Sequence, residues 1–168
     1  MSSRPASKPQ SSRRLRRPTG PRVTENTIVV AVNSSAQAYA ALRWALTEAN
    51  RRGDGLLAVN VLDRGRRADW RLERDPDAEF HEQQERLGAQ VSRAVKEHEV
   101  ATGEPVPPVQ VLVVQGDLVH VLGRLASDAH MLVLGRAQRR TPEAMAQELG
   151  THCPVMLIDE QGAASHAA

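Results

Sequence analysis

The chain has 168 residues, of which 25% are charged and 2% aromatic, and it carries a single cysteine. This length predicts one domain with a real hydrophobic core, which valine, leucine, isoleucine and alanine must build. No apolar run approaches the roughly eighteen residues that a membrane-spanning helix needs, and one cysteine, which cannot form an intrachain disulfide, fits the reducing cytosol.

The net charge of +2 conceals an asymmetry. Residues 1–22 carry seven of the 22 basic residues and no acid, so the rest of the chain, with fifteen basic and twenty acidic residues, has a charge of about −5. Rich in Ser, Pro and Arg, residues 1–22 predict a disordered basic tail. The tail is either solubilising or an arm for nucleic acid or an anionic membrane. The absence of interleaved aromatic residues favours the solubilising tail, and no apolar segment follows the arginines, so a signal peptide is not expected and the predicted location is cytoplasmic.

A strand, a helix and a second strand open the folded part. Residues 28–32 and 56–61 are short apolar runs, typical of strands that are buried on both faces of a parallel sheet. Between them, apolar residues recur at helical spacing from Tyr39 to Ala49. Asn33-Ser34-Ser35 supplies N-cap candidates, and Gly53 suits a left-handed helix end. The pattern predicts a right-handed βαβ unit.

A mostly charged stretch, residues 63–77, follows the second strand. Its Trp70 is expected to fold back as a small apolar cover on the domain, and the alternative of a lid over a ligand or partner surface stays open. Residues 78–102 then predict a long helix that ends at Gly103.

The remaining chain continues the alternation of strands and helices. Its predicted elements are strands at residues 109–114, 131–134 and 155–158, a helix at 118–129 and a short helix that follows Thr141 and ends at Gly150. Asp117 and Thr141 suit helix N-caps, and residues 161–168 are expected to form a flexible C-terminal tail. Five strands and four helices predict an open α/β sheet with helices on both faces, in a domain at residues 23–160.

Three segments resemble the universal stress protein family. They are the βαβ unit at residues 27–62, VVQGDLVHVLGRLASDAHMLVLG at 113–135 and MLVLGRAQRRTPEAMAQELGTHCPVMLID at 131–159. The resemblance covers roughly residues 26–159 and implies a Rossmann-like fold of the adenine nucleotide alpha hydrolase type, with parallel strands in the order 3-2-1-4-5. It also implies a homodimer in which the last strand, Val155–Ile158, pairs with its twofold mate, because this apolar edge strand exposes unpaired backbone groups.

A nucleotide site is expected at the carboxyl ends of the first and fourth strands, where the strand order reverses. The resemblance implies an Asp after the first strand and, after the fourth, a spaced set of three glycines that lets backbone N–H groups approach phosphates. In this chain Asn33 replaces the Asp, Gln138 replaces the second glycine and Glu148-Leu149 replaces the final Gly-Ser or Gly-Thr pair. Only Gly135 remains of four positions. The candidate nucleotide-contacting residues are Asn33, Ser34, Val61, Gly135, Arg136 and Arg139.

Two functional hypotheses remain. The first is a non-catalytic stress-response or regulatory protein of the cytoplasm, acting as a dimer with an unidentified protein partner, with no cofactor and weak or no ATP binding. The second is a divergent binder of ATP or AMP in which Arg136, Arg139 and Arg140 replace the glycines, since arginine binds phosphate in a bidentate manner. The missing glycines favour the first hypothesis.

An enzyme is the weakest reading of the sequence. No base, nucleophile and orienting group converge in it. Cys153, next to Pro154, is expected to be a small buried residue rather than a redox centre. His81 and Glu82 lack the second histidine of a zinc-protease helix, so no metal site is expected.

Overall fold

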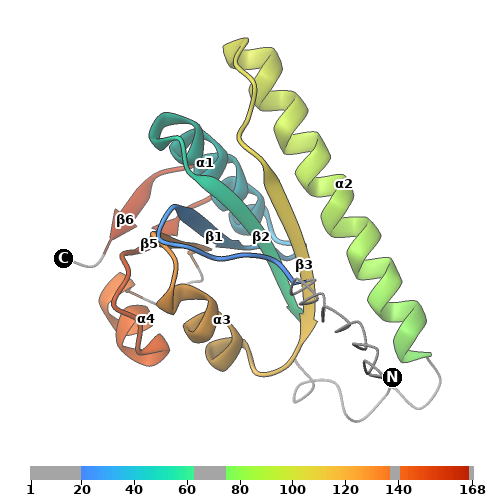
Figure 1. The fold of residues 1–168 in the computed structure, drawn as a ribbon, viewed down its shortest axis with the longest axis vertical. Coiled ribbons are helices and arrows are strands. Elements are labelled where there is room, and N and C mark those ends of the chain that lie inside the picture. Colours follow the sequence, from blue (N-terminus) through green and yellow to red (C-terminus); the bar gives the residue numbers. More distant parts are fainter. Residues whose placement is uncertain (1–19, 63–74, 137–140, 167–168) are drawn as a thin grey trace, which may run out of the picture.

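The computed structural model describes residues 20–62, 75–136 and 141–166. These residues form a six-stranded sheet in the order β3-β2-β1-β4-β5-β6, and its first five strands are parallel, as predicted (Figure 1). The strands are β1 (Thr27–Ala31), β2 (Gly55–Leu62), β3 (Val109–Gln115), β4 (Met131–Gly135), β5 (Val155–Ile158) and β6 (Ala164–His166). The helices are α1 (Ala36–Arg52), α2 (Pro76–Thr102), α3 (Leu118–Ser127) and α4 (Pro142–Leu149).

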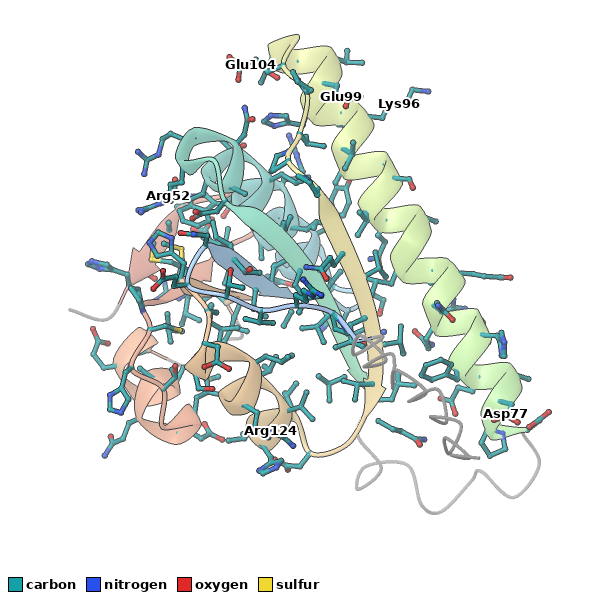
Figure 2. All side chains as sticks on the ribbon, in the orientation of Figure 1. Arg52, Asp77, Lys96, Glu99, Glu104 and Arg124 are labelled. Carbon is teal, nitrogen blue, oxygen red and sulfur yellow. The ribbon has the colours of Figure 1, made fainter. Side chains whose placement is uncertain are left out.

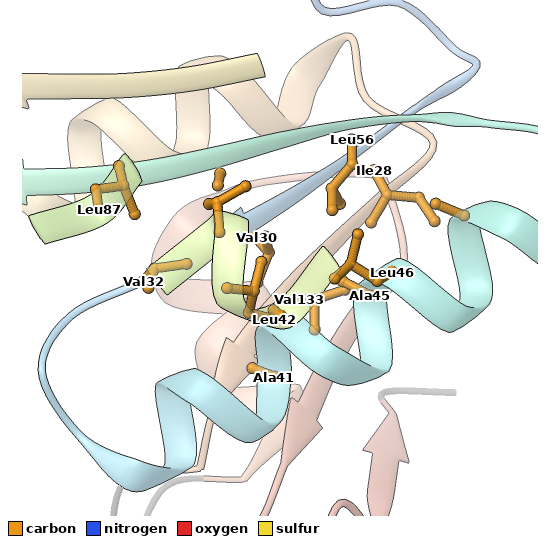
Figure 3. Close-up of a cluster of buried hydrophobic side chains, with 14 of the residues drawn as sticks. Ile28, Val30, Val32, Ala41, Leu42, Ala45, Leu46, Leu56, Leu87 and Val133 are labelled. Carbon is orange, nitrogen blue, oxygen red and sulfur yellow. The ribbon is translucent and has the colours of Figure 1, made fainter. Parts of the chain in front are cut away.

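Helices cover both faces of the sheet because its central strands are apolar at every position. Side chains alternate along a strand, so Ile28 and Val30 pack with α1 and α2, while Val29 packs with α3 and α4. Figure 3 shows the first cluster, in which Leu42 of α1 lies beside Val30, and Leu87 of α2 belongs to the same cluster. None of these five side chains is more than 1% exposed, so the helices on both faces pack directly against the sheet.

The helix ends follow the predicted local chemistry. Gly53 and Gly103 end α1 and α2 with φ angles of 72° and 69°, a left-handed conformation that glycine adopts without strain. Gly150 ends α4 in the same way. Asp117 accepts a hydrogen bond from His120 N at the start of α3, and Thr141 caps α4. These caps were all readable from the sequence.

The C-terminal segment differs from the flexible tail expected at residues 161–168. Its β6 pairs antiparallel with β5. A tight turn joins the two strands, in which Asp159 Oδ1 accepts hydrogen bonds from Gln161 N (3.0 Å) and Ala163 N (2.8 Å), and Gly162 takes a φ of 83°. The prediction that Val155–Ile158 is the edge of the sheet is therefore wrong.

The N-terminal boundary also differs from the predicted one. Arg22, expected to end the tail, exchanges two hydrogen bonds with the Gln110 side chain of β3: its N–H donates to Oε1 (2.9 Å) and its carbonyl accepts from Nε2 (3.0 Å). Residues 1–19 of the predicted tail, and Trp70 with most of the predicted cover or lid, lie outside the described residues. No described helix is both long and apolar enough to cross a membrane.

Candidate functional site

The carboxyl ends of β1, β2 and β4 meet at one edge of the sheet. Ala31 is in register with Val59 of β2, and Val30 with Val133 of β4. Following these registers beyond β1 places Asn33 level with Val61 on one side and with Arg136 on the other. The structure thus brings Asn33, Val61, Gly135 and Arg136 to the expected place, with Ser34 exposed in the loop after β1. Arg139 lies outside the described residues.

Asn33 is bonded to its own loop. Its Oδ1 accepts a hydrogen bond from Ser35 N at 2.8 Å, an Asx-type turn that leads into α1. Its main-chain carbonyl accepts from Gln90 Nε2 of α2 at 3.0 Å. The side-chain oxygen that would have to stand in for an Asp carboxylate toward a ribose therefore already has a donor.

Gly135 allows the end of β4 to touch the first turn of α1. A Cβ atom at this position would lie 2.7 Å from Ala38 N and 2.8 Å from the carbonyl carbon of Gln37, closer than real Cβ contacts. The Ala38 N–H is also satisfied, because Ser35 Oγ accepts from it at 3.1 Å. The helix N-terminus that would face an anion at this edge is thus packed against the sheet and capped by its own loop.

The other two described candidates have different surroundings. Val61 is half-buried and packs against the cluster beneath α3 and α4, so it forms a wall of the strand-end region. Arg136 is exposed and its N–H donates to Ile158 O at 2.7 Å, which continues the β4–β5 ladder. Among the described candidates, Arg136 is the one whose side chain brings positive charge to this edge.

The positions that match the C-terminal half of the glycine motif lie at the end of helix α4. Glu148, at the position of the motif's final glycine, is exposed in the last turn of α4. Gly150 has a φ of 60° and its N–H donates to Gln147 O, so it is a helix C-cap, as predicted. Gln138 lies outside the described residues.

Two side chains at this edge were missed by the sequence analysis. Gln90 is one of many polar residues of α2, and only the packing of α2 on α1 reveals that it reaches Asn33. Gln37 of α1 donates to the Glu160 carboxylate in the β5–β6 turn. The signal for the second contact was the Asp159–Gly162 turn sequence, of which Gln161 and Gly162 were assigned to the flexible C-terminal tail.

A cavity of about 320 Å³ lies elsewhere on the molecule. It lies over the outer side of α1, against the C-terminal half of α2 and the turn before β6, and is walled by Trp44 and His98. None of the five candidate nucleotide-contacting residues that the structure describes lines it. Figure 2 shows the same half of α2, labelled by Lys96 and Glu99, projecting past the sheet, with Glu104 just beyond its end. The cavity is therefore not evidence for a nucleotide site.

One acid–histidine pair lies at the opposite edge of the sheet. Asp54, which is 6% exposed, lies 2.6 Å from His130 Nδ1, and Arg52 Nη1 lies 3.3 Å from His130 Nε2. Because an arginine can only donate, the Nε2 lone pair accepts from Arg52 and Nδ1–H donates to Asp54. The pair ties the end of α1, labelled by Arg52 in Figure 2, to the start of β4. Both ring nitrogens of this histidine therefore have partners within the chain.

Cys153 is half-buried before β5. Burial raises the pKa of its thiol, although the Thr151 hydroxyl, 3.3 Å from Sγ, partly opposes this. A protonated thiol is a poor nucleophile and metal ligand. Within the described ranges, no group of three or more His, Cys, Asp or Glu side chains is arranged to hold a metal ion.

Comparisons with known proteins agree with this geometry. A sequence model of the Universal stress protein family matches residues 25–158. Similar solved structures include universal stress protein UspA from Lactobacillus plantarum (20% identity, 81% of this chain and 99% of that one, TM-score 0.52). A universal stress protein family member from Burkholderia pseudomallei has 24% identity over 82% of this chain and 98% of its own, with a TM-score of 0.55. A universal stress protein in complex with cAMP has 16% identity, covers 80% and 96%, and has a TM-score of 0.54. These identities show the shared fold alone, and no curated protein sequence matches the chain.

Proposed function

Because the chain belongs to the universal stress protein family, we propose that it is a non-catalytic stress-response or regulatory protein of the cytoplasm that binds adenine nucleotides weakly or not at all. The observation that carries this proposal is the state of the strand ends. Asn33 Oδ1 is bonded to Ser35 N, and Gly135 is filled by the first turn of α1. Asn33 Oδ1 and the Ala38 N–H at the start of α1, two of the groups that would contact a nucleotide, are therefore engaged within the chain.

This arrangement bounds the expected affinity. Asn33 Oδ1 already accepts from Ser35 N, so a nucleotide could use only its second lone pair, and a single hydrogen bond to a neutral acceptor contributes only about 1 kcal/mol net. On the side of Gly135 that faces α1, a single added carbon would already collide with the helix backbone, so that side leaves no room for a phosphate. We expect a dissociation constant for ATP above roughly 100 μM, which corresponds to less than about 6 kcal/mol of binding free energy.

The alternative is a divergent nucleotide binder that uses arginines in place of glycines. Its support is the exposed Arg136 at the strand ends, where a sheet of this topology holds ligands. A relative of the same fold was solved with cAMP. Arg136 and Arg139 would then bind phosphate by charge and by forked hydrogen bonds, at the cost of side-chain entropy and salt screening.

Calorimetry with Mg-ATP, at low and at physiological salt, separates the two proposals. Weak heats that vanish at physiological salt support the first. Micromolar binding that persists there, and that Arg136→Ala abolishes, would establish the arginine-based binder instead. Arg124→Ala is the matched control, because Arg124 is an exposed arginine in the last turn of α3 and is not a candidate nucleotide-contacting residue. Mass spectrometry of gently purified protein provides a second test, with co-purified ATP or AMP as the result against the first proposal.

The absence of catalysis is part of the same proposal. The His130 lone pair is directed to Arg52, and burial keeps the Cys153 thiol protonated. Neither residue is activated in the way that an acid–base or nucleophilic catalyst requires. A turnover of ATP to AMP or ADP that exceeds the buffer rate, and that is lost on His130→Ala, would contradict it.

We also propose that the domain forms a homodimer through Val155–Ile158. The strand is apolar, lacks proline and charge, and lies toward one end of the sheet. These are the features of a strand that accepts another strand at its side. In the structure, however, β6 lies in that place.

A further inference from the structure

Each residue of β5 presents its backbone groups to one neighbouring strand. Leu132 N of β4 donates to Pro154 O, and Arg136 N donates to Ile158 O. The even-numbered residues of β5 therefore bond to β4. Since successive residues of a strand direct their N–H and C=O groups to opposite sides, the groups of Leu157 point away from β4, toward β6.

The backbone of Leu157 is occupied by β6. The register pairs Leu157 with Ser165. Asp159, two residues further on, donates its N–H to Ala163 O at 3.1 Å, which makes this the hydrogen-bonded set of pairs. In addition, the Ser165 hydroxyl donates a hydrogen bond to Leu157 O, with an oxygen–oxygen distance of 3.4 Å. Any other strand that pairs with β5 must displace Ser165.

The contacts of β6 orient it without burying it. It has three residues, of which Ala164 and His166 are exposed, and none is a large apolar side chain. The turn before it is firmer, because Asp159 accepts two main-chain N–H groups and Glu160 accepts from Gln37 of α1. Such a strand is held by a few hydrogen bonds that each contribute only about 1 kcal/mol net.

We propose that β6 is a removable cover on β5, and that a second copy of this chain takes its place there. The inference rests on the self-association proposed above and adds how that association is regulated. Pairing about a twofold axis at Leu157 sets the apolar strand against itself in an isologous contact with no charge to oppose it. Both partners need the same backbone groups of Leu157, so the chain is a monomer with β6 in place and a dimer once β6 leaves.

A pair of proline variants tests the proposal. Ser165→Pro removes the N–H that points to Leu157 and should release β6. Ala164→Pro is the matched control, because the N–H of Ala164 points to the outer side of the strand. In sedimentation equilibrium the parent and the control should behave as 18.4 kDa monomers at micromolar concentration. Ser165→Pro should approach twice that mass, with a dimer dissociation constant at least about tenfold lower. A chain that ends at Gly162 should do the same.

Hydrogen exchange at the Leu157 amide shows where the copies meet. In the parent its protection should not depend on protein concentration, whereas in Ser165→Pro protection should be lost on dilution and regained on concentration. The proposal is overturned if Ser165→Pro and the chain ending at Gly162 both stay monomeric. It is also overturned if they dimerise without protecting Leu157, or if the parent is already a dimer with β6 paired. None of these results bears on nucleotide binding, which calorimetry tests separately.

Discussion

Gly135 is the position at which the strand-end geometry can be tested most directly. It has no positive φ, so its backbone conformation does not require glycine. What requires glycine is the close approach of α1: an added Cβ would meet Ala38 N at 2.7 Å and the Gln37 carbonyl carbon at 2.8 Å. Both contacts are backbone atoms, which cannot rotate away as a side chain can. Gly135→Ala must therefore move the helix or the strand.

The cost follows from that displacement. Ordinary van der Waals contact begins near 3.4 Å, so the first turn of α1 would have to retreat by several tenths of an ångström. That turn is held by Ser35 on Ala38 N and by Gln37 on Glu160, and the retreat strains both contacts. Overpacking of this kind costs about 1–3 kcal/mol, and the loss of hydrogen-bond geometry places Gly135→Ala in the upper half of that range. For a domain of this size, 2–3 kcal/mol lowers the melting temperature by roughly 5–10 °C.

Urea unfolding followed by far-UV circular dichroism measures this effect as a shift in the midpoint at a constant slope. Gly88→Ala is the control, because Gly88 lies inside α2 and a Cβ there meets nothing within 4 Å. It should stabilise the protein by about 0.5–1 kcal/mol through helix propensity. If Gly135→Ala were as stable as the parent, the reasoning would fail, since α1 would then not be packed against the end of β4.

Three further predictions concern other parts of the chain. Val30 is 0% exposed and should not tolerate a charge. Val30→Asp should lower the free energy of unfolding by at least about 3 kcal/mol. A variant that unfolds cooperatively with near-parent stability would contradict the sheet assignment. Hydrogen bonding to Arg51 lowers the pKa of Glu48 from 4.5 to about 2. Its carboxylate therefore stabilises the fold above about pH 4.5 and loses this effect as the pH falls toward 2. After solvent screening, Glu48→Gln should cost about 1 kcal/mol at pH 7, and urea titrations at pH 2 should show little difference from the parent. A chain starting at Gly20 should melt within about 2 °C of the full chain in calorimetry. A chain starting at Val23 also loses the two hydrogen bonds between the Arg22 backbone and the Gln110 side chain of β3, so it should melt measurably lower. Equal melting temperatures would show that those bonds add no stability.

The elements that the sequence predicted are those whose signals are local. Strands β1, β4 and β5 are continuous apolar runs, and their burial on both faces follows from that composition, whereas in the edge strand β3 only Val113 is buried. Helix ends were readable because capping depends on one or two side chains, such as Asp117 at the start of α3 and Gly103 at the end of α2. The strand order came from resemblance, since no single-sequence pattern states which parallel strands are neighbours.

The features that were not predicted depend on contacts between distant segments. Strand β6 is Ala-Ser-His, which lacks the β-branched and aromatic residues that mark a strand, and it exists because β5 offers unpaired backbone groups. Its sequence signal was the preceding turn, in which Asp159 and Gly162 have the residue types that such turns favour. The hydrogen bond from Gln90 to Asn33 had no local signal, because it joins α2 to a loop 57 residues away.

These long-range contacts change the meaning of the degenerate motif at the strand ends. Loss of the Asp and of two glycine positions alone would leave a vacant crevice, in which exposed arginines could bind phosphate. In the structure, Asn33 completes a turn, Gln90 bonds to its carbonyl and Gly135 admits α1. Restoring an Asp at position 33 would not by itself restore a site. The second glycine of the motif would still be missing, and Gly135 would still pack against the first turn of α1. The strand ends retain the topology of a ligand-binding edge, while their polar groups stabilise the fold itself.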